Sequence, residues 1–125
     1  MKYLLDSNII IDLLLDRSPA VQWFEQVHEK DIVICPVNHA EVLTGCRNAS
    51  DWEEASSFMN EIPMLNLELN DFISAAKIRQ IHHLKIVDAL LASLAIRYDL
   101  AFLTRNTKDF NPVVHKFVKI PYKLT

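Results

Sequence analysis

A chain of 125 residues, half of them apolar and 23% charged, is long enough for one folded domain and too apolar for a disordered protein. Its net charge of −3 excludes a protein that holds nucleic acid by bulk positive charge, although a nuclease with a metal-neutralised site stays open. The only glycine, Gly45, excludes the glycine-rich phosphate-binding loops. We therefore expect a single domain over residues 1–125.

The sequence shows no signal peptide, and no apolar run approaches the ~20 residues that cross a bilayer. Cys35 and Cys46 show no CxxC pattern, so they indicate neither a disulfide framework nor a zinc site. These features favour a cytoplasmic protein with no membrane partner.

Short apolar runs alternate along the chain with longer segments of helical periodicity. In chain order, the sequence predicts a strand at 2–5, helices at 8–16 and 18–30, a strand at 32–35, helices at 36–46 and 50–62, a strand or extended connection at 64–67, a helix at 70–81, a break at 82–85, a helix at 88–98, and strands at 100–104 and 117–120. Ser50 and Glu53 form a capping box that marks the start of the helix at 50–62. The alternation favours an α/β fold in three layers with a mostly parallel central sheet.

Four carboxylates stand at the edges of apolar runs, namely Asp6, Glu41, Asp88 and Asp109. Asp6 follows the first strand and Asp109 comes shortly after the strand at 100–104, near the carboxyl edge of a parallel sheet, where active sites form. Glu41 and Asp88 belong to helical segments that could border the same crevice. Acids gather in a low-dielectric site only around a cation, so their convergence would predict a hard divalent metal with oxygen ligands.

Each acid also has an ordinary structural interpretation. An Asp after a strand is most often a cap or turn residue, and Glu41 alone could be a solvated helix-face residue. Asp88 alone could be a first-turn acid favoured by the helix dipole. Asp12 and Asp16 are interpreted as solvated acids on a helix face.

Polar neighbours of the acids are candidates for substrate binding. Asn8, Thr104 and Asn106 could orient the acids or contact a phosphate, and a capping role is nearly as well supported by the sequence. Arg105 could pair with a phosphate of the substrate backbone, or it could be a surface cation.

Four stretches of the sequence resemble the PIN-domain family, and within it the VapC-like toxins of bacterial and archaeal toxin–antitoxin pairs. The stretches are Leu5-Asp6-Ser7-Asn8-Ile9, Ala40-Glu41-Val42, Asp88-Ala89-Leu90-Leu91-Ala92, and Leu103-Thr104-Arg105-Asn106-Thr107-Lys108-Asp109-Phe110. The resemblance spans essentially the whole chain. One departure is the segment His82-His83-Leu84-Lys85, where family members often carry a glycine.

This resemblance implies a PIN fold with a five-stranded parallel sheet and an endoribonuclease that depends on Mg²⁺ or Mn²⁺. It implies catalytic roles for the four acids, with Asp6 and Asp88 as direct metal ligands and with Glu41 and Asp109 acting through water or on a second ion. It also implies RNA as substrate, a homodimer, and silencing by a cognate antitoxin protein. The alternatives are a housekeeping PIN nuclease of RNA processing and a PIN-like binding module without catalysis.

Overall fold

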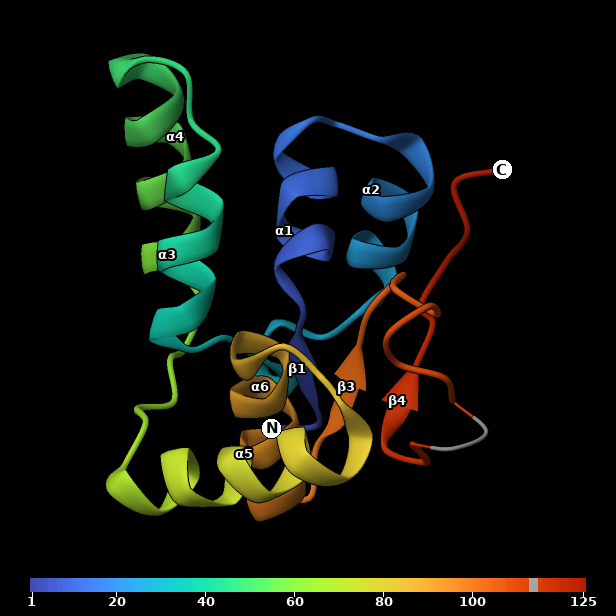
Figure 1. Ribbon diagram of the computed structural model, residues 1–125. Helices are drawn as coiled ribbons and strands as arrows, with labels where there is room; N and C mark the ends of the chain where they lie inside the picture. The colour runs from blue at the N-terminus through green and yellow to red at the C-terminus, as the bar shows by residue number, and fades with distance from the viewer. Residues whose placement is uncertain (113–114) are drawn as a thin grey trace.

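The computed structural model describes residues 1–112 and 115–125, in which four parallel strands form one sheet in the order β2-β1-β3-β4 (Figure 1). The strands are β1 (Tyr3–Leu5), β2 (Ile32–Val33), β3 (Ala101–Leu103) and β4 (Val118–Lys119). The helices are α1 (Ser7–Leu14), α2 (Ser18–Gln26), the short 3-10 turn η1 (Glu29–Asp31), α3 (Pro36–Thr44), α4 (Ala49–Asn60), α5 (Leu69–His82) and α6 (Ile86–Arg97). The expected α/β fold with a parallel sheet is confirmed.

The prediction of a fifth strand is wrong for the described residues. Residues 64–67 contribute a single parallel bridge, between Ile34 and Met64, next to β2 at the edge of the sheet. Two backbone bonds make it, from Ile34 N–H to Pro63 O (3.0 Å) and from Leu65 N–H to Ile34 O (2.8 Å). Pairing stops there because Pro63 has no N–H to donate and the Met64 side chain is 48% exposed. The segment is the extended connection that the sequence also allowed.

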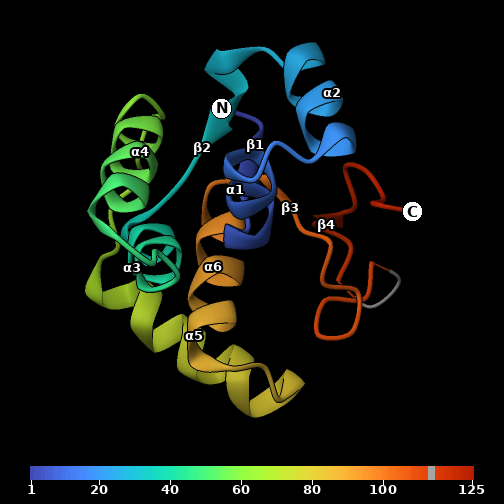
Figure 2. The same cartoon turned by 90° about the horizontal axis from the view of Figure 1, so that it is seen from above.

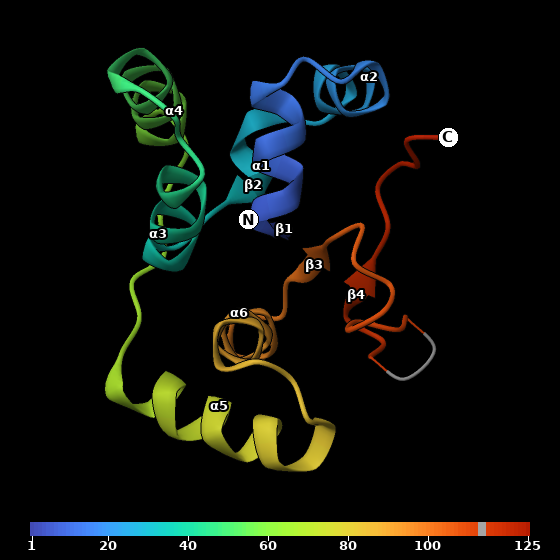
Figure 3. The same cartoon turned by 45° about the horizontal axis from the view of Figure 1, so that its top comes forward.

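Successive residues of the central strand β1 enter two separate cores. Leu4 packs in a cluster with Leu91 and Phe102, whereas Leu5 packs in a second cluster with Ile9. Side chains alternate along a strand, so one strand serves both faces of the sheet. Figure 3 shows the resulting layers, with α5 and α6 on one side of the strands and α1 to α4 on the other.

Helix α6 is the inner helix of its layer. All side chains from Ala89 to Ala95 are buried, and α5 packs along its outer side (Figure 3). A helix that is apolar on nearly all sides is stable only when it is covered in this way. Because α6 runs opposite to β3, which follows it, its first turn lies at the carboxyl edge of the sheet. None of the helices in the described residues is long and apolar enough to span a membrane.

Helix ends are built almost without glycine. Asp16, His83 and Asp99 adopt left-handed backbone conformations with φ of 53°, 58° and 53°, and the two aspartates suit them because a short polar side chain can bond locally. The cap of α4 differs from the prediction. Asn48 precedes Ser50 and caps the helix, with its Oδ1 accepting the Asp51 N–H at 2.8 Å, so the capping box at Ser50 is wrong.

Candidate active site

All four predicted acids line one pocket, of about 540 Å³, at the carboxyl edge of the sheet. Asp6 caps the N-terminus of α1, Glu41 lies in α3, Asp88 lies in the first turn of α6, and Asp109 follows β3. Figure 2 looks onto this edge, with α1, α3 and α6 grouped around it. The structure therefore brings together carboxylates from four separate parts of the chain.

Asp6 is the most firmly held of the four acids. Its Oδ2 accepts hydrogen bonds from the Thr104 hydroxyl (2.6 Å) and the Asn8 amide (3.1 Å), and its Oδ1 accepts the Ser7 N–H (2.8 Å). The residue is 6% exposed. Burial raises the pKa of Asp6, and the hydrogen bonds from Thr104 and Ser7 oppose that rise. Asp6 is thus an acceptor fixed in orientation before any ligand arrives.

Glu41 is held by a relay of hydrogen bonds that the sequence reasoning missed. Ser7 Oγ donates to Glu41 Oε1 at 2.7 Å, and the buried Asn38 donates through Nδ2 to Ser7 Oγ at 3.0 Å and to Leu5 O at 3.1 Å. Asn38 Oδ1 in turn accepts the Cys35 N–H at 2.8 Å. The available signal was an Asn in the first turn of the helix that carries Glu41, since a polar residue there must find partners when it is buried.

Asp88 lines the pocket from the first turn of α6 and is half-buried. Burial and the charges of Asp6, Glu41 and Asp109 raise the pKa of Asp88 from its ordinary 3.8 to about 6, while Lys85 lowers it. Within the described part of the chain, no hydrogen bond holds the Asp88 carboxylate. Its charge is therefore opposed by the other three acids and needs a cation to offset it.

Asp109 and Asn106 are joined in a local turn. Asn106 Nδ2 donates to Asp109 Oδ2 at 2.9 Å, and Asp109 N–H donates to Asn106 Oδ1 at 3.2 Å. Both residues line the pocket, as does Asn8. Thr104 is fully buried and accepts the Asn106 N–H at 2.9 Å, so it ties this turn to Asp6. Its hydroxyl orients other groups and does not line the pocket.

Arg105 is engaged outside the pocket. Its guanidinium donates to Asp12, with Nη2 to Oδ1 at 2.9 Å, and the Tyr122 hydroxyl donates to the same carboxylate. Asp12 is 1% exposed, so its interpretation as a solvated helix-face acid is wrong. Burial and Asp12 raise the pKa of Tyr122. The ring of Tyr122 lies 6.0 Å from that of Trp23, which places the C-terminal segment beside α2 (Figure 1).

The side chains present fit a hard cation better than a soft one. The acids of the pocket offer carboxylate oxygens, and neither His nor Cys lines it. Among the described residues, no group of three or more His, Cys, Asp or Glu side chains is already arranged to hold a metal ion.

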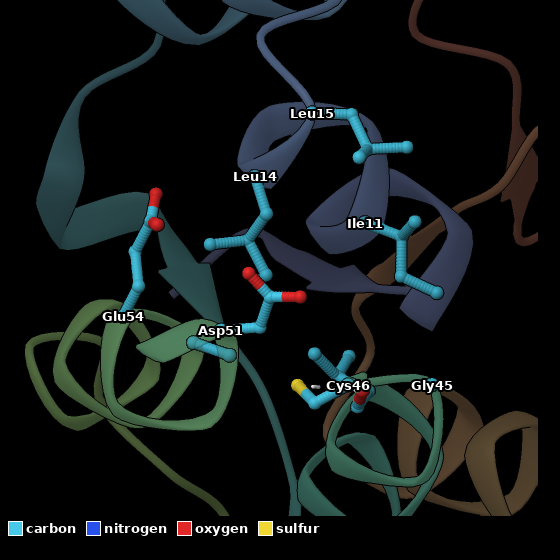
Figure 4. Close-up of a pocket in the computed structure, with 9 residues that line it drawn as sticks. Ile11, Leu14, Leu15, Gly45, Cys46, Asp51 and Glu54 are labelled. Carbon is cyan, nitrogen blue, oxygen red and sulfur yellow. Dashed lines mark hydrogen bonds between the residues drawn. The ribbon is translucent and has the colours of Figure 1, made fainter. Parts of the chain in front are cut away.

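A smaller pocket, of about 160 Å³, adjoins the acidic one and has a different character. Figure 4 shows Ile11 and Leu14 of α1, with Leu15 just after the helix, facing Cys46 and the α4 residues Asp51 and Glu54 across it. Ile11 also lines the acidic pocket, so the two pockets meet at this side chain. The lining is mostly apolar, which suits the docking of a polypeptide segment better than chemistry.

The PIN domain family model matches residues 3–115 of the chain, a range that includes all four acids. A toxin–antitoxin complex from Klebsiella pneumoniae contains a chain 28% identical to this one, with a TM-score of 0.86, covering 98% of this chain and 99% of that chain. The DNA-bound VapBC of Salmonella typhimurium gives 16% identity, a TM-score of 0.80 and coverage of 97% and 98%. VapBC-1 of nontypeable Haemophilus influenzae gives 19% identity, a TM-score of 0.75 and coverage of 97% and 98%. The comparison with curated proteins gives no match.

Proposed function

This chain belongs to the PIN domain family, and on that premise we propose that it is a metal-dependent endoribonuclease, the toxin of a toxin–antitoxin pair. The observation that supports the proposal most is the meeting of Asp6, Glu41, Asp88 and Asp109 in one pocket, where burial and the charges of the other three acids raise the pKa of Asp88. Such a pocket is suited to bind a divalent cation together with the anionic phosphodiester that the cation attracts.

Asp6 and Asp88 would hold the ion directly, because both line the pocket, Asp6 is its buried acid, and Asp6 is the acid whose charge acts most on Asp88. Glu41 and Asp109 would act through water or on a second ion. Mg²⁺ or Mn²⁺, when bound, supplies the positive charge that offsets the negative charge developing on the phosphoryl oxygens. Thr104 and Asn8 orient Asp6, while Ser7 orients Glu41, so the ligands need little rearrangement on binding.

Among the predicted substrate-binding residues, Asn8 and Asn106 line the pocket and can meet a phosphate oxygen with an amide N–H. Thr104 and Arg105 are engaged with Asp6 and Asp12, so we assign them to positioning. Neither of these two residues needs to touch RNA to matter for cleavage, because both hold the segment that carries Asn106 and Asp109.

We further propose that a cognate antitoxin protein binds this chain at the apolar pocket of Figure 4. The Klebsiella pneumoniae relative is described as part of a toxin–antitoxin complex. Because Ile11 lines both pockets, a segment docked in the apolar one lies beside the acids and can block access to them. Inhibition would then follow from occlusion, with no change of fold.

A homodimer is also part of the proposal. Aromatic side chains are common at such interfaces, and of four such side chains Trp23, Phe24 and Phe58 pack partly buried against the core, whereas Trp52 is 52% exposed. Mass measurement by light scattering after size exclusion tests this point. A monomer at micromolar concentration would contradict it.

The nuclease proposal is tested with purified protein and fluorescently labelled single-stranded RNA of mixed sequence. We expect cleavage with Mg²⁺ or Mn²⁺, none with EDTA, and a loss on the order of 10³-fold in kcat/KM for Asp6→Asn. Glu53→Gln, an exposed change on α4, serves as the matched control and should cleave like wild type. RNA that is bound but never cut would contradict the enzyme and favour the binding-module alternative.

The toxin role needs a separate experiment in cells. We expect expression of the wild type to arrest growth, the Asp6→Asn variant to be harmless, and the product of a neighbouring gene to restore growth. Cleavage without growth arrest would favour a housekeeping nuclease of RNA processing.

A further inference from the structure

The acidic pocket has a cationic side that the sequence reasoning did not identify. Arg79, in the last turn of α5, and Lys85, just before α6, line the pocket together with Asp88. Neither cation forms an ion pair within the described part of the chain. Arg105, by contrast, is engaged with the buried Asp12.

The connection between α5 and α6 fixes this side of the pocket. His83 ends α5 in a left-handed conformation, Leu84 is buried, and Arg79 Nη1 donates to Leu84 O at 3.3 Å. That bond uses one of the five N–H donors of the guanidinium. Arg79 is thereby anchored at the rim, and its charge remains available to an anion in the pocket.

The start of α6 adds to the positive potential at the same place. Lys85 makes no side-chain capping bond, and both Ile86 and Val87, whose N–H groups begin the helix, line the pocket. Unpaired N–H groups at a helix start carry partial positive charge. The helix start supports the two side-chain cations, which carry the argument.

We propose that Arg79 and Lys85 bind a phosphate of single-stranded RNA next to the scissile one. The inference rests on the proposed nuclease function. Four carboxylates and a net charge of −3 repel the RNA backbone on either side of the metal-bound phosphate. The two unpaired cations on the pocket wall offset that repulsion for one neighbouring phosphate. Arg79 and Lys85 thereby fix the direction in which the RNA strand crosses the pocket.

Charge-removing variants test this assignment in the whole protein. Arg79→Gln keeps an amide donor for Leu84 O, and Lys85→Gln changes a residue without a capping role, so both variants should fold. Lys77→Gln, an exposed change on α5 away from the pocket lining, is the matched control. Thermal melts of every variant show whether the fold is retained.

We expect each pocket variant to raise KM for labelled single-stranded RNA by about fivefold or more, with kcat within about twofold of wild type. A lost phosphate contact should also reduce the slope of log affinity against log salt by about 0.7. The charge-conserving Arg79→Lys and Lys85→Arg should restore most of that slope. Lys77→Gln should match wild type in KM and slope.

The outcomes separate this inference from the function on which it rests. If the wild type cuts RNA and the Gln variants match Lys77→Gln in KM and slope, the phosphate site is overturned while the nuclease stands. If kcat falls with the salt slope unchanged, the two cations act on the fold or on Asp88, which also overturns the site. If the wild type cuts no RNA with either metal, both proposals fail together.

Discussion

The two sides of the acidic pocket are built on different principles. On the β1 side, Asp6 accepts three hydrogen bonds, and Glu41 is reached through Ser7 from the buried Asn38. On the α6 side, no hydrogen bond from the described residues fixes Asp88, and burial together with the neighbouring acids raises its pKa to about 6. One side is organised by hydrogen-bond donors, whereas on the other, among the described residues, the only partners of the acid are nearby charges, with Lys85 opposing the three acids.

This difference shows how a protein can keep several acids close together before a cation binds. Hydrogen bonds to Asp6 stabilise its charged form and keep its geometry. Among the residues that the structure describes, Asp88 has no such partners, so its charge stays unfavourable without a cation, and on the proposed function the bound ion would offset it. We expect metal binding to stabilise the fold, because the ion binds the folded state and not the unfolded chain.

The largest expected effect on stability comes from replacing Asp12, the buried acid that accepts hydrogen bonds from Arg105 and Tyr122. Asp12→Ala leaves Arg105 and the Tyr122 hydroxyl without their shared acceptor, so the free energy of unfolding should fall by about 3 kcal/mol. Tyr122→Phe should cost about 1 kcal/mol, since it removes only one donor. Urea titrations followed by circular dichroism measure both. Equal effects of the two variants would show that Asp12 does not organise the β1 side.

Removing one donor from Asp6 should weaken catalysis more than stability. Thr104→Val deletes the hydroxyl that donates to Asp6 Oδ2, with little change of volume. We expect kcat/KM for RNA to fall by about 10- to 100-fold, as for other groups that orient a metal ligand, and Thr104→Ser to restore most of it. Steady-state cleavage assays at saturating Mg²⁺ measure the change. If the Thr104→Val enzyme is as active as wild type, the hydrogen bond from Thr104 does not orient Asp6 for catalysis.

The two metal-ligand candidates should respond oppositely to the same isosteric change. In EDTA, Asp6→Asn should lower the free energy of unfolding by about 1–2 kcal/mol, because an amide cannot accept from all the present donors. Asp88→Asn should raise it, because the change removes a carboxylate that three others repel. Chemical denaturation near neutral pH, with Glu53→Gln as control, measures whether each variant raises or lowers the free energy of unfolding. Destabilisation by both variants would mean that the two sides are alike.

The raised pKa of Asp88 predicts how the stability of the fold depends on pH. The folded-state pKa of Asp88, about 6, lies above its ordinary 3.8, so the folded protein binds the proton more tightly than the unfolded chain does. In EDTA, stability should therefore be lost as pH rises from about 4 through about 6, and Asp88→Asn should make that part of the curve less steep, leaving the contribution of Asp6, whose pKa is also raised. Melting temperatures across this range provide the measurement. A flat curve for the wild type would contradict the raised pKa.

The smallest expected effect concerns Lys85, the nearby cation that lowers the pKa of Asp88. Lys85→Met should move the pH midpoint of that stability loss upward by less than about one unit, because water screens the pair. Lys77→Met, on the exposed face of α5, should leave it unchanged. A downward shift with Lys85→Met would show that the lysine does not face the carboxylate.

Much of the site could be predicted because acids at strand ends of a parallel sheet share one edge. Asp6 and Asp109 follow β1 and β3, which are paired neighbours, so their proximity follows from the order of strands. The extent of the sheet was less predictable. A run of apolar residues at 64–67 has strand-like composition, yet Pro63 and the exposed Met64 limit it to one bridge.

The sequence alone determined the alternation of strands and helices, the parallel sheet and the four acids, because periodicity and the succession of elements can be read from short stretches of chain. Only the tertiary structure decided which charge meets which partner. Arg105 finds Asp12 across 93 positions of sequence, Tyr122 finds it across 110, and Asn38 reaches Ser7 across 31. Such pairs depend on packing that places side chains within about 3 Å, a distance at which hydrogen bonds form and which no local pattern encodes.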